Sequence, residues 1–487
     1  MRTTFSTSKS APSKAEAVII PVASSGPVGA GVGLNREQLS ALGFEGRACQ
    51  TVTLPGDKGK VRVLVGVGDV RELDANTMRN IAAAAARASS RYASVATTLA
   101  SVGRGATKAN AQAVVEGMAL ALHRWADLKN DKGSLPKLTS VTLVSSTETS
   151  ALTAGMNAGV TTAGAVCNAR DFANTPPSHL TARAFAERAV AIAAESNLAS
   201  TVYDKDQLAA MGCGGLVGVN AGSVEPPRMV KLEYKPANAK SHVVLVGKGV
   251  MYDSGGISLK PSDPSHASMK MDMSGAAAVL ATMSALNALK VKTRVTAFLM
   301  CTDNMPSGSA LKLGDVLTMR NGKTVEIHNT DAEGRLILAD GLSLGAELKP
   351  DAMLDIATLT GACMGALGKH MAGVLGNNDA VLAQIKQSSS RTDELVWELP
   401  LHRPYRSLLD SNVADMRNIG GPLAGATTAA LFLSEFVGST PWVHIDMAGP
   451  MDSDGDNGWL NRGATAYGAR LMIDFCANFT KPGRKNK

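Results

Sequence analysis

Short apolar runs alternate with segments of helical periodicity along this 487-residue chain, and this alternation most constrains its fold. In the second half, strands are expected at residues 242–246, 295–300, 325–327, 353–356 and 442–445, and helices at 274–289, 334–348, 424–436 and 464–475. Strands that alternate with helices form largely parallel or mixed sheets covered by those helices. The sequence contains no apolar run long enough to cross a bilayer. We therefore predict a soluble α/β protein.

The first half repeats the alternation more weakly, with strands expected at residues 17–22, 61–67 and 140–144 and helices at 74–95 and 110–126. A chain of 487 residues exceeds one ordinary core, so two domains are expected. We predict a disordered leader at residues 1–16, an N-terminal α/β domain at 17–147, a connecting helix at 148–174, and a C-terminal domain at 175–487. The connecting helix is expected to end before Pro176 and Pro177, since proline cannot continue a helix.

The net charge and the cysteine content indicate which binding partners and which cellular compartment to expect. The net charge of +7 permits nucleic-acid binding but does not favour it, because the sequence lacks a basic stripe with interleaved aromatic residues. DNA binding stays an alternative function, which salt-dependent DNA binding that persists without Glu333 would support. The six cysteines are scattered without a CxxC pair, which is typical of reduced thiols inside cells. We expect a cytoplasmic protein without membrane partners.

Seven charged residues lie beside glycines and just after the predicted strands: Lys248, Asp253, Lys260, Asp272, Asp331, Glu333 and Arg335. Taken singly, Asp272, Asp331 and Glu333 could each be an acid in the first turn of a helix. Taken together, they supply the bridging and terminal carboxylates that two divalent cations about 3.5–4 Å apart require. Lys248 could join them only as a neutral amine. The set predicts a two-metal hydrolase.

Two other kinds of site were weighed. A nucleotide-binding loop at residues 247–256 is disfavoured because Lys248 is followed by Gly249 and Tyr252 occupies the place of the third glycine in the dinucleotide pattern. It would predict nucleotide affinity that does not depend on divalent metal. The eight histidines contain no HExxH motif. His444 is expected to be a hydrogen-bonded core residue, and His328 to be structural.

Residues 247–261, 269–277 and 329–336 resemble the leucyl aminopeptidase (cytosol aminopeptidase) family. Further matches lie at residues 170–177, 357–361, 414–418 and 444–449, so the resemblance covers essentially all of residues 165–487. It implies a smaller, macro-like N-terminal α/β domain and a larger C-terminal α/β catalytic domain, whose mixed central sheet is flanked by helices. One departure is that the loop between Pro261 and Met269 is a residue longer than the usual pattern.

The resemblance also implies a role for each matching residue. Asp253, Asp331 and Glu333 would hold one metal ion, and Lys248, Asp253, Asp272 and Glu333 the other. Lys260 and Arg335 match the catalytic residues that do not bind metal. The residues that would bind the substrate are Met269, Thr358, Leu359, Gly361, Ala448 and Met451.

The implied activity is an aminopeptidase that prefers leucine-like first residues. Two ions, with zinc or manganese favoured, would activate a bridging water molecule. Lys260 would stabilise the oxyanion, and Arg335 would hold a bicarbonate that shuttles the proton. The substrates would be peptides with a free N-terminus, and the family implies a homohexamer.

Overall fold

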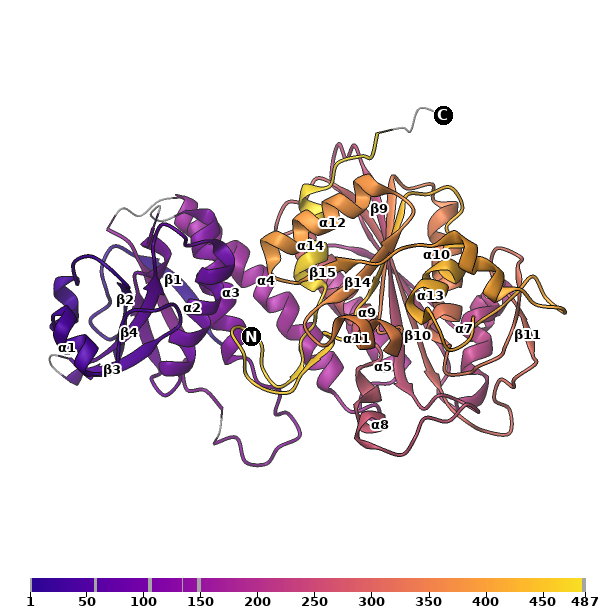
Figure 1. The fold of residues 1–487 in the computed structure, drawn as a ribbon, viewed down its shortest axis with the longest axis horizontal. Coiled ribbons are helices and arrows are strands. Elements are labelled where there is room, and N and C mark those ends of the chain that lie inside the picture. Colours follow the sequence, from indigo (N-terminus) through magenta and orange to yellow (C-terminus); the bar gives the residue numbers. More distant parts are fainter. Residues whose placement is uncertain (1, 57–58, 104–106, 134, 147–149, 484–487) are drawn as a thin grey trace. The chain divides into compact units, whose positions relative to one another are not determined.

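The computed structural model describes residues 2–56, 59–103, 107–133, 135–146 and 150–483. The chain forms two compact units, Met1–Cys167 with Ser453–Gly463, and Asn168–Asp452 with Ala464–Lys487. Both are built from mixed sheets and helices, as the sequence predicts (Figure 1). The division between them falls inside helix α4, Ser150–Asn174, in the region expected to form the connector. Residues 453–463, which were expected in the C-terminal domain, group with the first unit.

The first unit contains a six-stranded sheet in the order β1-β6-β5-β2-β4-β3, parallel except for the β3–β4 pair. Its strands are β1 (Thr4–Ser8), β2 (Ala17–Ala23), β3 (Thr51–Pro55), β4 (Val61–Gly68), β5 (Ser94–Thr97) and β6 (Ser140–Val144). Its helices include α1 (Arg36–Ala41), α2 (Ala75–Ala88) and α3 (Lys108–Leu122). Helices α2 and α3 approach closely at Gly117, where an added Cβ would lie 2.1 Å from the Arg79 carbonyl oxygen.

The structure differs from the expectation for this unit in two places. Residues 4–8, expected in a disordered leader, form β1 and pair in parallel with β6. Side-chain hydrogen bonds anchor the same segment, including one from Thr3 Oγ1 to the Leu138 carbonyl at 3.1 Å. Strand β5 begins at Ser94, inside the expected helix 74–95, because α2 already ends at Ala88. The mainly buried run Ser94–Thr97 instead fills the gap between β2 and β6.

The second unit contains a mixed eight-stranded sheet in the order β15-β14-β17-β13-β9-β10-β8-β7. Its strands are β7 (Ala199–Tyr203), β8 (Arg228–Tyr234), β9 (His242–Asp253), β10 (Arg294–Asn304), β13 (Ala352–Ala357), β14 (Ala372–Gly376), β15 (Val396–Glu398) and β17 (Trp442–Asp446). A smaller sheet is formed by β11 (Val316–Thr318), β12 (Thr324–Glu326) and β16 (Met416–Arg417).

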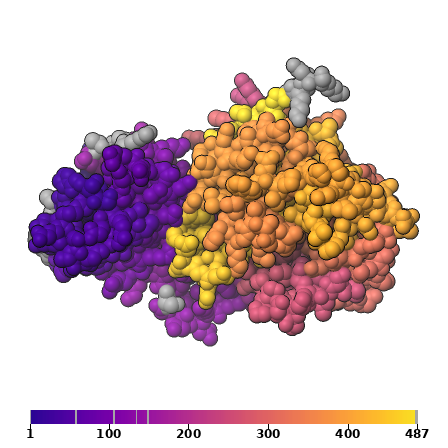
Figure 2. All heavy atoms as spheres, in the orientation of Figure 1, coloured from indigo at the N-terminus to yellow at the C-terminus, as the bar shows by residue number. Residues whose placement is uncertain are grey.

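The helices of this unit pack against the large sheet and against one another. They are α5 (Ala182–Glu195), α6 (Lys205–Ala210), α7 (Gly214–Val219), α8 (Pro264–Ser268), α9 (Ser274–Leu286), α10 (Gly334–Glu347), α11 (Gly361–Leu367), α12 (Asp379–Thr392), α13 (Gly425–Ser434) and α14 (Ala469–Asn478). In the space-filling view, the orange segments that include α12 and α13 cover much of the visible surface of this unit (Figure 2). None of the helices in the described ranges has the length and apolarity needed to span a membrane.

Strand β9 lies between β10 and β13, and its two faces meet different helices. On one face, an added Cβ at Gly247 would lie 2.6 Å from Ala276 Cα of α9, so this glycine permits close helix packing. On the other face, Val246 contacts α10, where an added Cβ at Gly341 would lie 2.6 Å from Val246 Cγ1. The glycines around Lys248 therefore serve strand–helix packing, which removes the main reason for a nucleotide-binding interpretation.

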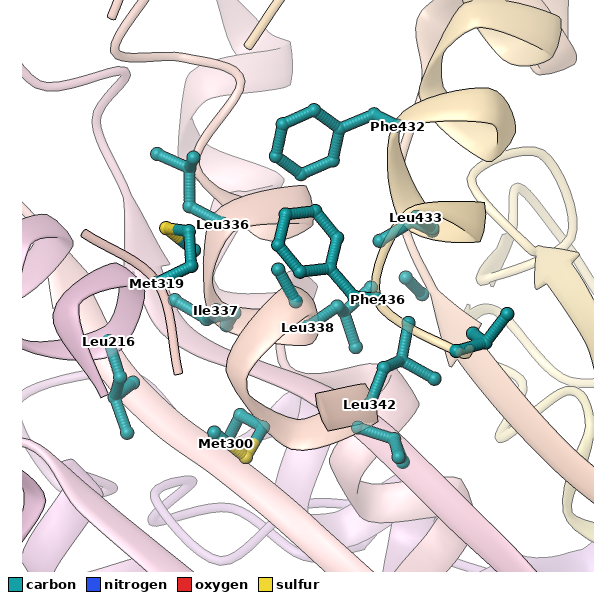
Figure 3. Close-up of a cluster of buried hydrophobic side chains, with 14 of the residues drawn as sticks. Leu216, Met300, Met319, Leu336, Ile337, Leu338, Leu342, Phe432, Leu433 and Phe436 are labelled. Atoms are coloured by element: carbon teal, nitrogen blue, oxygen red, sulfur yellow. The ribbon is translucent and has the colours of Figure 1, made fainter. Parts of the chain in front are cut away.

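The face of the sheet that meets α10 carries a large hydrophobic core. Leu336, Ile337 and Leu338 of α10 pack with Phe432 and Phe436, which lie on and just beyond α13 (Figure 3). All five side chains are at most 2% exposed. This core fixes the first turn of α10, which directly follows two of the predicted metal ligands. All six cysteines of the chain are free thiols; five are buried, and Cys49 is exposed.

Candidate active site

Four neighbouring strands of the large sheet, β10, β9, β13 and β17, are mutually parallel and end at the same edge. Asp253, Asn304 and Asp446 are the last residues of β9, β10 and β17, and Thr358 directly follows β13. Binding sites of open α/β sheets gather outside the carboxyl ends of the strands. The predicted site lies at this edge.

The sequence suggested loop positions for Lys248 and Asp253, but both residues lie in strand β9. The expected strand stopped at residue 246, but pairing with β13 continues to Gly247, and pairing with β10 continues β9 to Asp253. Side chains alternate along a strand, so Lys248 lies on the same face as Val246, toward α10. An added Cβ at Gly334, the first residue of α10, would lie 2.7 Å from Lys248 Cε. Only a glycine leaves room for the lysine there.

Two lysines and four carboxylates form one cluster at this position. Lys248 Nζ lies 2.8 Å from Asp272 Oδ2 and 2.8 Å from Glu333 Oε1, and it donates to the Thr358 carbonyl at 2.8 Å. Lys260 Nζ lies 2.9 Å from Asp253 Oδ2 and 2.5 Å from Asp331 Oδ1. The structure thus brings together all five predicted metal ligands and Lys260.

The carboxylates have the arrangement that a cation requires. One oxygen each of Asp253, Asp331 and Glu333 lies within 4.8 Å of the others. Asp272 Oδ2, Asp331 Oδ1 and Glu333 Oε1 are buried, and within the described residues none has a hydrogen-bond partner. The cations beside these oxygens are the ammonium groups of Lys248 and Lys260. Four carboxylates with only two ammonium groups, at a largely buried position, fit a site for divalent cations.

Burial dominates the electrostatics of the cluster. It raises the pKa of Glu333 to about 8, and the nearby Asp253 adds to this rise. It also raises the pKa of Asp272 to about 7, because Lys248 offsets only part of the cost of burial. Burial alone would lower the pKa of Lys248, but the surrounding carboxylates outweigh it and raise that pKa. The same balance raises the pKa of Lys260. Without a metal ion, both lysines are therefore ammonium ions at neutral pH.

Hydrogen bonds orient the carboxylates from behind. Asp253 Oδ1 accepts from Asn304 Nδ2 at 2.8 Å and from the Gly255 N–H at 2.9 Å, which leaves Oδ2 facing Lys260. Asp272 Oδ1 accepts from Thr358 Oγ1 at 2.6 Å, which leaves Oδ2 facing Lys248. Asn304 was not predicted to be a site residue. The only feature of the sequence that indicates such a role is its position as a polar residue shortly after the apolar run 295–300.

Arg335 lies in the first turn of α10 and is 5% exposed. Its Nη1 donates to the carbonyl of Asn418 at 2.7 Å, whereas its Nε is buried and has no partner within the described residues. Burial lowers the pKa of Arg335 to about 10, and the guanidinium still remains charged at neutral pH. Arg335 is thus a fixed cation with a free donor, not a base.

Five of the six predicted substrate-binding residues lie on the segments that follow β13 and β17. Asp446, which is fully buried, accepts from the N–H groups of Leu359 and Ala448 at 3.3 Å each. It also accepts from Thr360 Oγ1 at 2.7 Å, so one carboxylate joins the two loops. The three other predicted positions lie on neighbouring segments: Met269 begins a short 3-10 turn that ends just before Asp272, Gly361 is exposed at the start of α11, and Met451 is half-buried three residues after Ala448.

The two histidines singled out from the sequence take structural positions. His444 is fully buried, and its Nδ1 lies 2.5 Å from Asp355 Oδ1. Trp442 Nε1 donates to the other Asp355 oxygen at 2.6 Å. The expectation that His444 is a hydrogen-bonded core residue is confirmed. His328 Nε2 lies 3.0 Å from Glu326 Oε1 at a more exposed position.

Comparison with known proteins agrees with this geometry. Residues 167–473 match the model of the cytosol aminopeptidase family, catalytic domain, and residues 31–132 match that of the same family's N-terminal domain. A probable cytosol aminopeptidase of Alkaliphilus metalliredigens is 38% identical over 460 residues, which are 92% of each chain. Another, of Desulforapulum autotrophicum, is 43% identical over 378 residues, 77% of this chain and 73% of that protein.

A solved structure has the same fold over nearly the whole chain. The bottromycin maturation enzyme BotP, in complex with Mn, superposes with a TM-score of 0.87 at 36% sequence identity. The match covers 95% of this chain and 99% of that one.

Proposed function

This chain belongs to the cytosol aminopeptidase family, and from that premise we propose that it removes leucine-like residues from the N-terminus of peptides by means of two metal ions. The family establishes a metal-dependent aminopeptidase. The two-ion mechanism and the leucine preference are our proposals. The observation that carries them is the buried cluster at the strand ends, in which four carboxylates surround two lysines.

We assign the ligands as the resemblance implies. Asp253, Asp331 and Glu333 would hold one ion, and their mutually close oxygens support this set. Lys248, Asp253, Asp272 and Glu333 would hold the other, with Lys248 as a neutral amine. When bound, the ions would lower the pKa of a water molecule between them and polarise the first peptide carbonyl. Manganese and zinc are the proposed ions, and manganese accompanies the related BotP structure.

Lys260 would stabilise negative charge on the substrate. Its Nζ is held between Asp253 and Asp331, and its side chain is 18% exposed, more than any other charged side chain of the cluster except Asp331. An ammonium fixed in this way can donate to the oxygen of a carbonyl under attack without reorganising first. Arg335 would hold a bicarbonate that moves the proton, and its free buried Nε supports an anion there.

The substrate would approach from the side of Asp331, whose side chain is 32% exposed while those of Asp253, Asp272 and Glu333 are at most 6% exposed. Its first side chain would contact the substrate-binding residues named above: Met269, Thr358, Leu359, Gly361, Ala448 and Met451. Two of these are methionines, which adapt to apolar side chains of different shape. This composition supports a preference for leucine-like residues.

A comparison of leucinamide with N-acetyl-leucinamide tests the proposal. The protein should hydrolyse leucinamide only, because the free amine must bind at the metal centre. Chelation should abolish the hydrolysis, and Mn²⁺ or Zn²⁺ should restore it. Equal cleavage of the acetylated compound, or full activity after chelation with no bound metal by elemental analysis, would contradict the proposed function.

We also propose a homohexamer in the cytoplasm. The family resemblance supports the hexamer, and the six free thiols together with the cytosol aminopeptidase relatives support the compartment. Light scattering should give six times the 50.3 kDa mass of the chain. A monomeric mass would refute the assembly.

A further inference from the structure

Asn418 is a fully buried, uncharged residue that directly follows the short strand β16. It belongs to neither the metal ligands nor the catalytic pair. Yet its side chain and its main chain both contact the segment from residue 328 to residue 335, which carries Asp331, Glu333 and Arg335.

The amide of Asn418 bonds to four main-chain groups of that segment. Its Oδ1 accepts from the N–H of His328 at 2.9 Å and from that of Asn329 at 3.3 Å. Its Nδ2 donates to the carbonyl of Asn329 at 2.6 Å and to that of Ala332 at 3.4 Å. These bonds enclose Asp331 on both sides, so they fix the turn from which its carboxylate projects.

The main chain of Asn418 contacts the other functional group. Its carbonyl accepts from Arg335 Nη1 at 2.7 Å. Its N–H donates to the Glu326 carbonyl at 3.0 Å, which continues the pairing of β16 with β12 by one residue. One residue therefore connects the small sheet, the ligand-bearing turn and the guanidinium.

The small sheet is itself held in register. Thr324 opens β12, and both its N–H and its Oγ1 donate to Asp415 Oδ2, at 2.8 and 3.0 Å. The Asp415 N–H donates back to Thr324 Oγ1 at 3.0 Å. These three bonds lie just before the parallel pairs Val325–Met416 and Glu326–Arg417. They set the register between β12 and β16, which places Asn418 next to the turn that carries Asp331.

We propose that Asn418 is a positioning residue, which uses the small sheet to fix the Asp331 turn and Arg335 in the geometry that binds metal. The inference rests on the proposed function, since it concerns the same metal centre. Only an amide supplies a donor and an acceptor in one planar group of this size. Aspartate has the same shape but would place an oxygen against the carbonyls of Asn329 and Ala332.

The substitution Asn418→Asp separates positioning from simple charge. An added carboxylate near a cation site would raise metal affinity if charge alone mattered. If the four bonds position the turn, affinity should fall by about tenfold or more, the range found when residues that orient metal ligands are lost. Asn377→Asp is the matched control, because Asn377 also joins two segments, with Nδ2 donating to the Thr440 carbonyl at 3.0 Å and Oδ1 accepting from the Trp442 N–H at 2.7 Å.

Calorimetric titration of the chelator-treated full-length protein with Mn²⁺ provides the measurement. We expect a loss of affinity in Asn418→Asp and less than about a twofold change in Asn377→Asp, which lies at the opposite end of β17 from the site. Unchanged or tighter Mn²⁺ binding in Asn418→Asp would overturn the proposal. So would an equal loss in the two variants.

If Asn418→Asp does not fold, a second variant tests the same proposal. Thr324→Val leaves Asn418 in place but removes both hydroxyl bonds to Asp415. It should weaken Mn²⁺ binding in the same direction by a smaller factor, and an unchanged affinity would count against positioning by the sheet. Because calorimetry needs no turnover, a wild-type protein that binds Mn²⁺ but does not hydrolyse leucinamide would refute the proposed function without deciding this inference.

Discussion

Replacing Gly334 with alanine tests the metal centre at the point where α10 meets Lys248. The new Cβ would lie 2.7 Å from Lys248 Cε and 2.8 Å from its Nζ. Ordinary contact starts at 3.4 Å, so the end of the lysine must retreat by about 0.7 Å. Because these atoms end a flexible side chain, the main chain of α10 need not move. We therefore expect the damage to fall on the site and not on the fold.

The size of the effect follows from what Lys248 loses. Its Nζ lies 2.8 Å from each of Asp272 Oδ2, Glu333 Oε1 and the Thr358 carbonyl. A retreat of about 0.7 Å lengthens at least one of these contacts beyond hydrogen-bond range. It also displaces the Nζ that would bind a metal ion, and losing groups that place a metal ligand lowers metal affinity by about 10- to 100-fold.

Gly341→Ala in the same helix is the control. Its Cβ would lie 2.6 Å from Val246 Cγ1 and 3.0 Å from Met300 Sδ, so it overpacks the core without touching the site. Overpacking should cost about 1–3 kcal/mol of stability, partly offset by the better helix propensity of alanine. In urea unfolding, Gly341→Ala should lose stability while Gly334→Ala should not. In calorimetry, Gly334→Ala should lose Mn²⁺ affinity while Gly341→Ala should not. The reasoning is refuted if Gly334→Ala binds Mn²⁺ as tightly as the wild type.

Two further predictions concern catalysis and pH. Lys260→Ala and Arg335→Ala should each lower kcat for leucinamide by about 100-fold or more while metal content survives, and an equal loss of metal would refute their assigned roles. Burial lowers the pKa of His242 to about 4, so its neutral form is favoured in the fold and stability should be lost as pH falls from about 6.5 toward 4. Between pH 7.5 and pH 5, the urea midpoint should fall less for His242→Gln than for the wild type; equal falls would contradict this.

The sequence predicted the buried elements of the fold better than its edges. Three expected strands correspond closely to β2, β4 and β6, because continuous apolar runs mark strands buried on both faces. The edge strands β1, β3, β7 and β15 were not predicted. They are short and partly polar, and pairing with a neighbour holds them in place, which no local pattern records. β5 was missed because it follows the alanine-rich α2 after a short gap.

The charged residues of the site could be predicted from the sequence because clustered charges beside glycines and strand ends indicate a functional site. Four carboxylates beside glycines have no structural role that would explain them, and the structure brings all four together. The secondary structure around these residues was predicted less well. Lys248 was expected just after the strand at residues 242–246, because the continuous apolar run ends there, although Gly247 and Gly249 admit neighbouring groups to a central strand.

The residues that orient the site were not predicted, and the reason is general. Asn304, Asn418 and Asp446 are each at most 4% exposed and act through segments 26 to 90 positions away in sequence. Each ends or directly follows a strand. A buried polar group must find partners, and at the carboxyl end of a strand those partners belong to the loops that form the site. A single uncharged polar residue in that position is therefore a signal for an orienting residue, even where no charge accompanies it.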